Sequence, residues 1–492
     1  MDSLPPSVQE LAEQQTAAAR KRLGIAESLV AMGLRYRLVH DDRKQAYLVV
    51  EHPEGGSRPL RIRSNECRHY LRAQFRRETG HLVNDQALTT ALSVLETEAL
   101  TSGELVRFGL RFLQTESEIW VDLGDARGRA VRITSEGWSV IDKPTVMFRR
   151  WNHMMPLPVP ETGGDLCTIF RFLNVKRKED KILLQCWMVT ALLANIPRPL
   201  LLLHGTQGSG KSVAAAMIRS LLDPSASALL SLGRDEAELA QVLDHHAIPV
   251  FDNVTSLPGW ISDLLCRAVT GGALSKRELY SDSDDVLLAF RCAPMMTGIN
   301  IPVRAPDLLD RIWMIGLERL SPEQRKQEGG LWSDFDRARP LLFGAILDAL
   351  VGAMRRYPTV GLNRTTRMAD ASVWGASVAL SLGYSIEEYE QALWGNSDNQ
   401  ADALLEDDPF AQVVHDFVVR HGRWEGTATE FLDILNGERK GSCSTGWPSK
   451  ADGVSRRLRT LAPLLACIGV EVSFRKTTNG RRVMQLIRHG GP

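Results

Sequence analysis

The fold of this chain is decided by the segment Gly205-Thr206-Gln207-Gly208-Ser209-Gly210-Lys211-Ser212, called the phosphate loop below. Its spacing, a glycine and four residues before Gly-Lys-Ser, is that of a loop that cradles phosphates. The apolar run 199–203 predicts a buried strand before it, and residues 212–222 predict a helix after it. Backbone N–H groups and a helix N-terminus would then face the ligand. We expect all eight residues to bind ATP, with Lys211 at the β- and γ-phosphates and the Ser212 hydroxyl on Mg²⁺.

A second magnesium ligand is expected at Asp252, which ends the apolar strand 247–251 and follows Lys211 by 41 residues. A carboxylate at this place can hold the magnesium-bound water. The next residue is Asn253, where many ATPases carry a second acid that polarises the attacking water. The general base is therefore left open. Asp252 could serve both purposes, or an acid from elsewhere could contribute.

Two further catalytic roles are expected downstream. Asn300 ends another apolar segment, where an amide can orient the lytic water against the γ-phosphate. Arg311 precedes an apolar strand, and we expect it to act as an arginine finger on the nucleotide of a neighbouring subunit. Arg304 is the nearby competitor for that role. A surface ion pair between Asp310 and Arg311 is the alternative to any finger.

Between these elements, residues 273–280 and 286–290 are two β-like runs joined by a short polar turn, which predicts a hairpin. Such an insertion is typical of ATPases that pull DNA through a ring. Lys276 and Arg277 are the candidate phosphate contacts. The turn carries three aspartates, which would repel a phosphate backbone, so a different task for the hairpin stays open.

The C-terminal segment predicts a DNA-binding module. Helices are expected at 408–421, 427–435 and 449–468, followed by a hairpin over 470–487 whose Asn-Gly pair marks the turn. This is the order of a winged helix-turn-helix domain, whose third helix enters the major groove. Residues 441–492 carry nine Lys and Arg against two acids, which favours a phosphate-binding surface over a merely solvated basic face. The candidate DNA contacts are Arg456, Arg457, Arg459, Arg475, Lys476, Arg481 and Arg482.

The chain of 492 residues is long enough for several domains, and we expect a multidomain fold. Helices at 65–79 and 84–99 and strand-like alternation over 105–150 predict an α+β N-terminal domain without a chemical motif that we can name. Apolar strands alternate with helices over 198–320, which predicts a parallel sheet with helical crossovers. The polar run 395–402 predicts a break between domains. The expected domains are an α+β domain at 1–155, an α/β P-loop AAA+ core at 165–320, a helical lid at 321–394 and the winged helix at 405–492.

Bulk composition excludes several classes of protein. Basic and acidic residues balance at 59 each, and no apolar run approaches the roughly 20 residues needed to span a bilayer. The first residues lack a charged region followed by an apolar stretch, so we expect no export. The seven cysteines form no Cys-x-x-Cys pair that would suggest a zinc site or a disulfide framework. We expect a cytoplasmic protein with no membrane partner.

Residues of about 165–350 resemble the ATPase module of phage and integrative-element replication proteins, which are superfamily 3-like helicases related to the AAA+ class and often fused to a primase. The matching segments are the phosphate loop, Val250–Asn253, Arg277–Tyr280, Gly298–Asn300, Leu309–Arg311 and, more loosely, Leu331–Leu347. The resemblance implies a homo-oligomeric ring, a hexamer, that is driven by ATP and Mg²⁺ along single-stranded or forked DNA. Residues 1–160 show no primase signature, so a primase would be a separate polypeptide. The N-terminal domain would then form a collar or contact origin DNA.

The leading functional hypothesis is a ring helicase for replication of a phage, plasmid or integrative element. The alternative is a non-helicase AAA+ regulator, such as a transposition or defence ATPase that binds DNA and signals by its nucleotide state. A small-molecule kinase would use the same phosphate loop. The predicted hairpin, the arginine before the last strand and the basic C-terminal module all disfavour a kinase.

Overall fold

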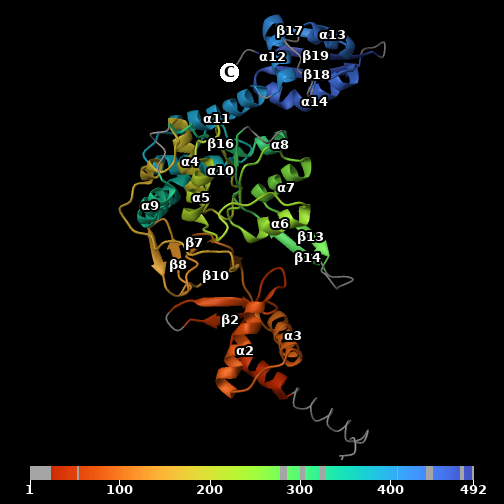
Figure 1. Ribbon diagram of the computed structural model, residues 1–492. Helices are drawn as coiled ribbons and strands as arrows, with labels where there is room; N and C mark the ends of the chain where they lie inside the picture. The colour runs from red at the N-terminus through yellow and green to blue at the C-terminus, as the bar shows by residue number, and fades with distance from the viewer. Residues whose placement is uncertain are drawn as a thin grey trace, which may run out of the picture. The chain divides into compact units, whose positions relative to one another are not determined.

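The structure is a computed structural model with a multidomain, mixed α/β fold. The chain divides into two compact units, Met1–Val159 and Pro160–Pro492 (Figure 1). The structure describes residues 24–52, 55–277, 285–299, 305–321, 327–406, 408–438, 447–476 and 481–489. Within these residues, no helix is both long and apolar enough to cross a membrane.

The first unit contains a four-stranded sheet packed against helices, among them a helical segment at 24–33 that precedes the sheet. The sheet has the order β3-β2-β1-β4. Helix α2 begins after Ser64, whose side chain accepts a hydrogen bond from the Cys67 N–H, and ends at Gly80 in the left-handed region. Both helices predicted here are confirmed, and their apolar faces pack with the sheet in one core. The elements are β1 (Arg37–His40), β2 (Ala46–Glu51), β3 (Ser57–Arg61), α2 (Asn65–Thr79), α3 (Asp85–Thr101) and β4 (Glu104–Leu105).

A second sheet completes this unit. It is an antiparallel meander in the order β6-β7-β8-β9, formed by β6 (Phe112–Gln114), β7 (Ile119–Asp122), β8 (Ala130–Ile133) and β9 (Trp138–Ile141). A short parallel pair, β5 (Phe108–Gly109) and β10 (Met147–Phe148), flanks it. The strand-like alternation of residues 105–150 thus corresponds to strands.

The second unit is built on a parallel four-stranded sheet in the order β12-β15-β11-β16. Most of its residues are buried, as expected of a parallel sheet covered on both faces. The strands are β11 (Leu200–His204), β12 (Val250–Phe251), β15 (Met295–Gly298) and β16 (Ile312–Gly316). The parallel sheet confirms the prediction made from the alternation of apolar strands and helices.

Helices and one hairpin surround this sheet. Strands β13 (Gly272–Arg277) and β14 (Asp285–Phe290) pair in antiparallel fashion, so the predicted hairpin is present, and they pack beside α6 and α7 (Figure 1). Its turn, residues 278–284, lies outside the described residues. The helices of this part are η1 (Leu166–Arg171), α4 (Lys178–Thr190), α5 (Lys211–Leu222), α6 (Glu236–His245), α7 (Gly259–Thr270) and α8 (Pro306–Leu309).

A helical region follows, formed by α9 (Glu328–Arg356), η3 (Tyr357–Thr359), α10 (Ala369–Ser381) and α11 (Ile386–Glu406). Helix α11 runs through the polar run 395–402, so this segment is helical, and the domain boundary expected there stays a prediction. Two of the polar residues there, Asn396 and Gln400, lie one helical turn apart and are 3% and 7% exposed. Their side chains hydrogen-bond to the backbone of β16, the edge strand of the sheet. Their polar side chains thus satisfy backbone N–H and C=O groups at the edge of the sheet.

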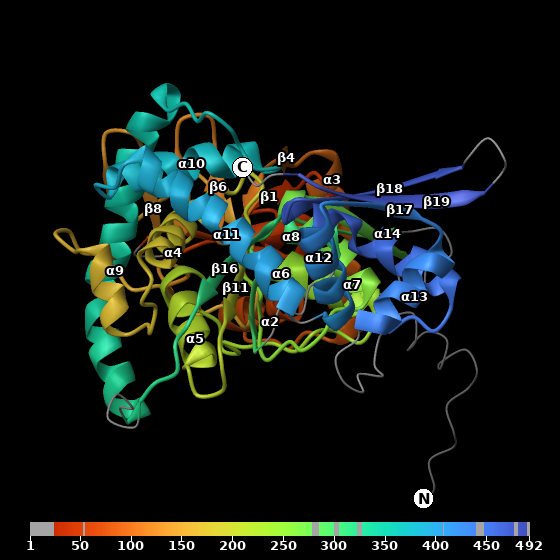
Figure 2. The same cartoon turned by 90° about the horizontal axis from the view of Figure 1, so that it is seen from above.

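The C-terminal residues form three helices and a three-stranded sheet in the order β17-β19-β18, seen together in Figure 2. The three predicted helices and the hairpin are present, and the hairpin turn 477–480 lies outside the described residues. The short strand β17 was not predicted. The elements are α12 (Pro409–His421), β17 (Arg423–Gly426), α13 (Ala428–Glu438), α14 (Ala451–Cys467), β18 (Val470–Lys476) and β19 (Arg482–Arg488).

Candidate nucleotide and magnesium site

The phosphate loop joins β11 to α5 in a conformation that requires its glycines. Gly205, Gly208 and Gly210 all have positive φ, at 151°, 83° and 82°. A Cβ atom on Gly205 would lie 2.2 Å from the backbone oxygen of Leu317. The chain can therefore pass close to the residues that follow β16 only with glycine at this position. The loop ends at the first turn of α5, whose N–H groups face the loop side.

Lys211 is folded back on the loop. Its Nζ donates hydrogen bonds to the carbonyl oxygens of Gly205 at 2.7 Å and Thr206 at 2.9 Å, and it lies 3.4 Å from Ser209 Oγ. Burial lowers the pKa of Lys211, and the negative charge of Asp252 opposes this effect. An anion bound in the loop would offer the ammonium group stronger partners than two neutral carbonyls.

Ser212 and Asp252 come together at the carboxyl edge of the sheet, as the sequence predicted. Ser212 Oγ donates to the Asp252 carboxylate, with distances of 2.8 Å to Oδ1 and 3.1 Å to Oδ2. Both side chains offer oxygen atoms, which Mg²⁺ prefers, and a hydroxyl beside a carboxylate leaves further positions for water and phosphate oxygens. These residues therefore fit a Mg²⁺ ion.

A third residue, Thr297, completes this cluster and was missed by the sequence reasoning. It lies on β15 and is 1% exposed. Its Oγ1 donates to Asp252 Oδ1 at 2.5 Å and accepts the Asn253 backbone N–H at 2.8 Å. Asn253 adopts a left-handed conformation with φ of 54°. The signal for Thr297 is the parallel register of Met296 with Phe251, which places residues 297 and 252 side by side.

Two buried or half-buried groups flank the loop on the side of β16. Asp180 of α4 accepts a hydrogen bond from the Gly316 N–H at 3.2 Å, and burial raises its pKa to about 6. His204 ends β11, and its pKa is lowered by burial and by the positive charges of Arg177 and Lys211. Burial is thus the main cause of both pKa shifts. Neither group belongs to the cluster around Asp252.

Arg311 forms its contacts within the chain. Its Nη1 donates to the Asp307 carbonyl oxygen and lies 3.6 Å from Cys266 Sγ. Among the ion pairs of the described residues, Asp310 is joined to Arg367 at 3.6 Å, and the predicted alternative, a pair with Arg311, is not found. The finger role of Arg311 stays a prediction.

Asn300 and Arg304 lie outside the described residues. The backbones of Lys276 and Arg277 lie on β13, opposite Val286 and Asp285, while their side chains are outside the description. Their predicted roles at the nucleotide and on DNA are unchanged.

The basic residues of the C-terminal segment differ in how they are held. Arg457 donates to Asp408, a 6% exposed residue that caps α12, at 2.6 Å and thus stabilises the domain from within. Arg459 lies 4.5 Å over the ring of Phe474. Arg475 and Arg481 form exposed ion pairs with Glu425 and Glu430, which are weak in water. The remaining candidates, Arg456, Lys476 and Arg482, are exposed.

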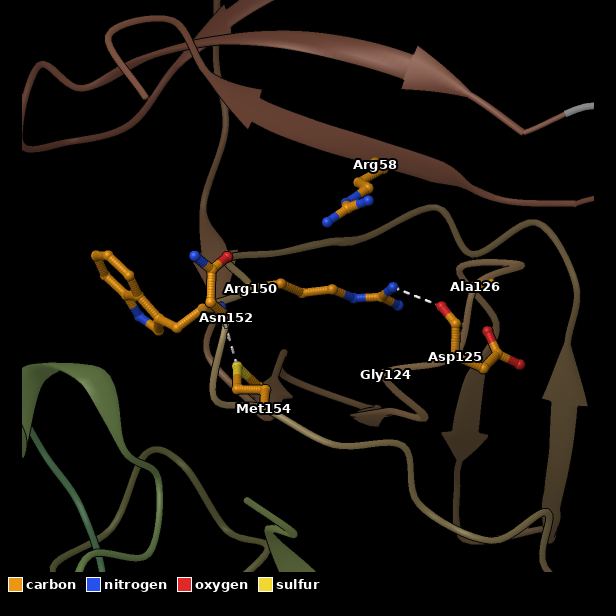
Figure 3. Close-up of a pocket in the computed structure, with 8 residues that line it drawn as sticks. Arg58, Gly124, Asp125, Ala126, Arg150, Asn152 and Met154 are labelled. Atoms are coloured by element: carbon orange, nitrogen blue, oxygen red, sulfur yellow. Dashed lines mark hydrogen bonds between the residues drawn. The ribbon is translucent and has the colours of Figure 1, made fainter. Parts of the chain in front are cut away.

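The first unit holds a separate polar cavity of about 400 Å³. Arg58 and Arg150 both point toward it (Figure 3). Arg150 is already committed, because it donates to both carboxylate oxygens of the buried Asp122, at 2.6 and 2.9 Å, and to the Asp125 carbonyl at 2.7 Å. Arg58 pairs with Glu66. The positive charges of both arginines at the cavity are thus compensated.

Most of the second unit matches two protein-family models. Residues 166–398 match the family model of the actinomycete integrative conjugative element replication protein, and residues 410–491 match the model of the AICE RepA C-terminal domain. The two matched stretches together cover more than half of the chain. No curated protein matches it.

Among solved structures, the A form apo structure of the NrS-1 C-terminal region is 12% identical, with 95% of this chain and 99% of that chain covered and a TM-score of 0.40. A second A form apo structure of the same region is 11% identical, with the same coverage and a TM-score of 0.38. Neither score reaches 0.5, so the overall fold of that region is not assigned to this chain.

Proposed function

Since this chain belongs to the replication proteins of actinomycete integrative conjugative elements, we propose that it is an ATP-driven, ring-forming DNA helicase that unwinds such an element for replication. The observation that carries this proposal is the meeting of Ser212 and Asp252 at 2.8 Å beside the phosphate loop. The loop, a hydroxyl and a carboxylate are the parts that hold Mg-ATP in P-loop NTPases of AAA+ and superfamily 3 type.

The residues of the site divide the work of hydrolysis. ATP and Mg²⁺ supply the transferable phosphoryl group and the charge that neutralises its oxygens. The loop N–H groups and the N-terminus of α5 bind the phosphates, and Lys211 exchanges the carbonyls of Gly205 and Thr206 for phosphate oxygens. Ser212 and Asp252 would hold the Mg²⁺ ion. Asn300 orients the attacking water, and Arg311, or its competitor Arg304, reaches the nucleotide of the next subunit in a homo-hexamer.

DNA binding is assigned to the C-terminal domain and the β13–β14 hairpin. The order of three helices and a three-stranded sheet supports a winged helix, with α14 as its recognition helix. Arg456 and Arg459 are exposed on α14, while Val454 and Leu458 face the core of the domain. Lys476 and Arg482 extend the basic surface onto the hairpin that would be the wing. A primase, if the element uses one, would act as a separate polypeptide.

The first test is ATP hydrolysis and unwinding of forked DNA by the intact chain, with Lys211→Ala and Arg311→Ala beside it. Lys143→Ala and Arg337→Ala, both at exposed positions, are the matched controls. We expect both activities to be lost in the two site variants and kept in the controls, with the Arg311 variant still binding ATP. If Arg311 acts in trans, mixing the Arg311→Ala variant with the unmutated chain should lower the activity by more than the variant's share of the mixture.

The alternative is a non-helicase AAA+ regulator that binds DNA and changes its state with the nucleotide. DNA-stimulated hydrolysis without unwinding of any fork polarity would favour that function. Full activity of the Arg311 variant would contradict the finger assignment and move it to Arg304.

A further inference from the structure

We propose that Thr297 is a positioning residue of the magnesium site, which holds the Asp252 carboxylate in the orientation that binds the metal. This inference rests on the proposed function, because it concerns the same Mg-ATP site. Thr297 would act through the Asp252 carboxylate, which its hydroxyl contacts directly.

Both the hydroxyl and the carbonyl group of Thr297 form hydrogen bonds at the site. Its hydroxyl donates to Asp252 Oδ1 at 2.5 Å and accepts the Asn253 N–H at 2.8 Å. Its carbonyl oxygen accepts the Val254 N–H, also at 2.8 Å. One residue therefore binds three consecutive positions, the candidate metal ligand and the two residues after it.

These contacts determine which way Asp252 points. β12 is only two residues long and ends immediately before Asp252, so strand pairing alone does not fix the carboxylate. Ser212 reaches it from α5 and Thr297 from β15, and both hydroxyls donate to Oδ1. When Ser212 turns its oxygen toward a metal, Thr297 is the donor that still holds the carboxylate. Partners of this kind behind a metal ligand typically change metal affinity about 10- to 100-fold when removed.

Burial makes the hydroxyl of Thr297 costly to leave unused, and both its donor and its acceptor capacity are in use. The side chain is 1% exposed. A threonine placed there only to fill a β-strand would be replaced by valine without loss, because the two side chains have nearly the same shape. The hydroxyl, and not the shape, is therefore the property to test.

The test compares Thr297→Val, which removes the hydroxyl, with Thr297→Ser, which keeps it. The matched control is Thr190→Val, because Thr190 is also 1% exposed and its hydroxyl bonds only to helix α4. Binding of a fluorescent ATP analogue is measured over a Mg²⁺ titration and in EDTA. Hydrogen exchange of the peptide containing Asn253 is measured in the nucleotide-free chain.

We expect Thr297→Val to need about 10- to 100-fold more Mg²⁺ for half-maximal binding, while binding in EDTA stays within about twofold. The Asn253 peptide should exchange faster in this variant. Thr297→Ser and Thr190→Val should both follow the unmutated chain. An unchanged Mg²⁺ requirement in Thr297→Val, or a Thr297→Ser as impaired as the valine variant, would overturn the inference and leave the proposed function standing. Absence of Mg²⁺-dependent nucleotide binding in the unmutated chain would overturn both.

Discussion

Replacing Asn396 with alanine should destabilise the second unit strongly, although the residue lies on a helix and far along the chain from the phosphate loop. Its Oδ1 accepts the Met314 N–H at 3.0 Å, its Nδ2 donates to the Met314 carbonyl, and Gln400 Nε2 donates to the same Oδ1 at 3.0 Å. Met314 lies on the edge strand β16 and is 2% exposed. The alanine variant therefore leaves two backbone groups of a buried strand without partners.

Each buried backbone group left unpaired costs about 1 to 3 kcal/mol, and alanine returns at most about 0.7 kcal/mol through its better helix propensity. We expect a net loss of about 2 to 5 kcal/mol in the free energy of unfolding. Asp398→Ala, at an exposed position two residues on, is the control of matched size and should change it by less than about 1 kcal/mol.

The assay is urea denaturation of the intact chain, combined with hydrogen exchange of the peptide containing Met314. Faster exchange at Met314 in the Asn396 variant alone would show that the loss arises at the sheet edge. If both variants unfold at the same urea concentration and protect Met314 equally, the side chain of Asn396 does not cover the edge, and our explanation of the polar run 395–402 is wrong.

The remaining predictions concern three other places. Arg457→Ala should lower the stability of the C-terminal domain by roughly 2 to 3 kcal/mol in thermal melts, since it leaves the carboxylate of Asp408 without its ion pair in a mostly buried position. Arg456→Ala, at an exposed site, should leave the melt unchanged and reduce the salt dependence of DNA binding by about one phosphate contact. Asp180 has a pKa raised to about 6 in the folded chain, so the folded state binds the extra proton between about pH 4 and 6 and stability falls as pH rises through that window. Asp180→Asn should therefore gain up to about 3 kcal/mol over the unmutated chain at pH 7.5 and almost nothing at pH 4, measured by urea denaturation at both values. Asn253→Gly should be neutral or slightly stabilising in the same assay, because φ is 54° there, whereas Asn253→Ala should cost about 1 kcal/mol.

Local sequence signals predicted the parts of this fold that depend on local physics. The glycines of the phosphate loop indicate backbone conformations that other residues avoid. Helix α2 begins at a serine and ends at a glycine, as helix capping preferences predict. The approach of Ser212 to Asp252 also followed, because each comes after an apolar strand, and parallel strands bring their carboxyl ends to one edge.

Long-range pairing accounts for what was missed. Thr297 is one polar residue in an apolar segment, and only the pairing of β15 with β12 shows that its hydroxyl faces Asp252. Asn396 and Gln400 have the composition of a domain break, yet they are buried against strand β16, whose position more than 80 residues earlier is not visible in a local pattern. In both places, polar side chains form hydrogen bonds with polar groups that are distant in the sequence. The periodicity of hydrophobic residues carries no information about such contacts.

The conformation of Asn253 bears on the open question of the general base. Its backbone N–H is held by Thr297, and its positive φ is one that asparagine tolerates better than glutamate does. A glutamate at position 253 would therefore have to accept a strained backbone or give up the hydrogen bond to Thr297. The local structure thus favours a single Asp252 carboxylate that is held in one orientation over a glutamate carboxylate beside it. If Asp252 binds Mg²⁺ as proposed, the base that activates water comes from another part of the chain or from a neighbouring subunit of the proposed ring. In the second case, hydrolysis by the isolated chain should be slow until that ring assembles.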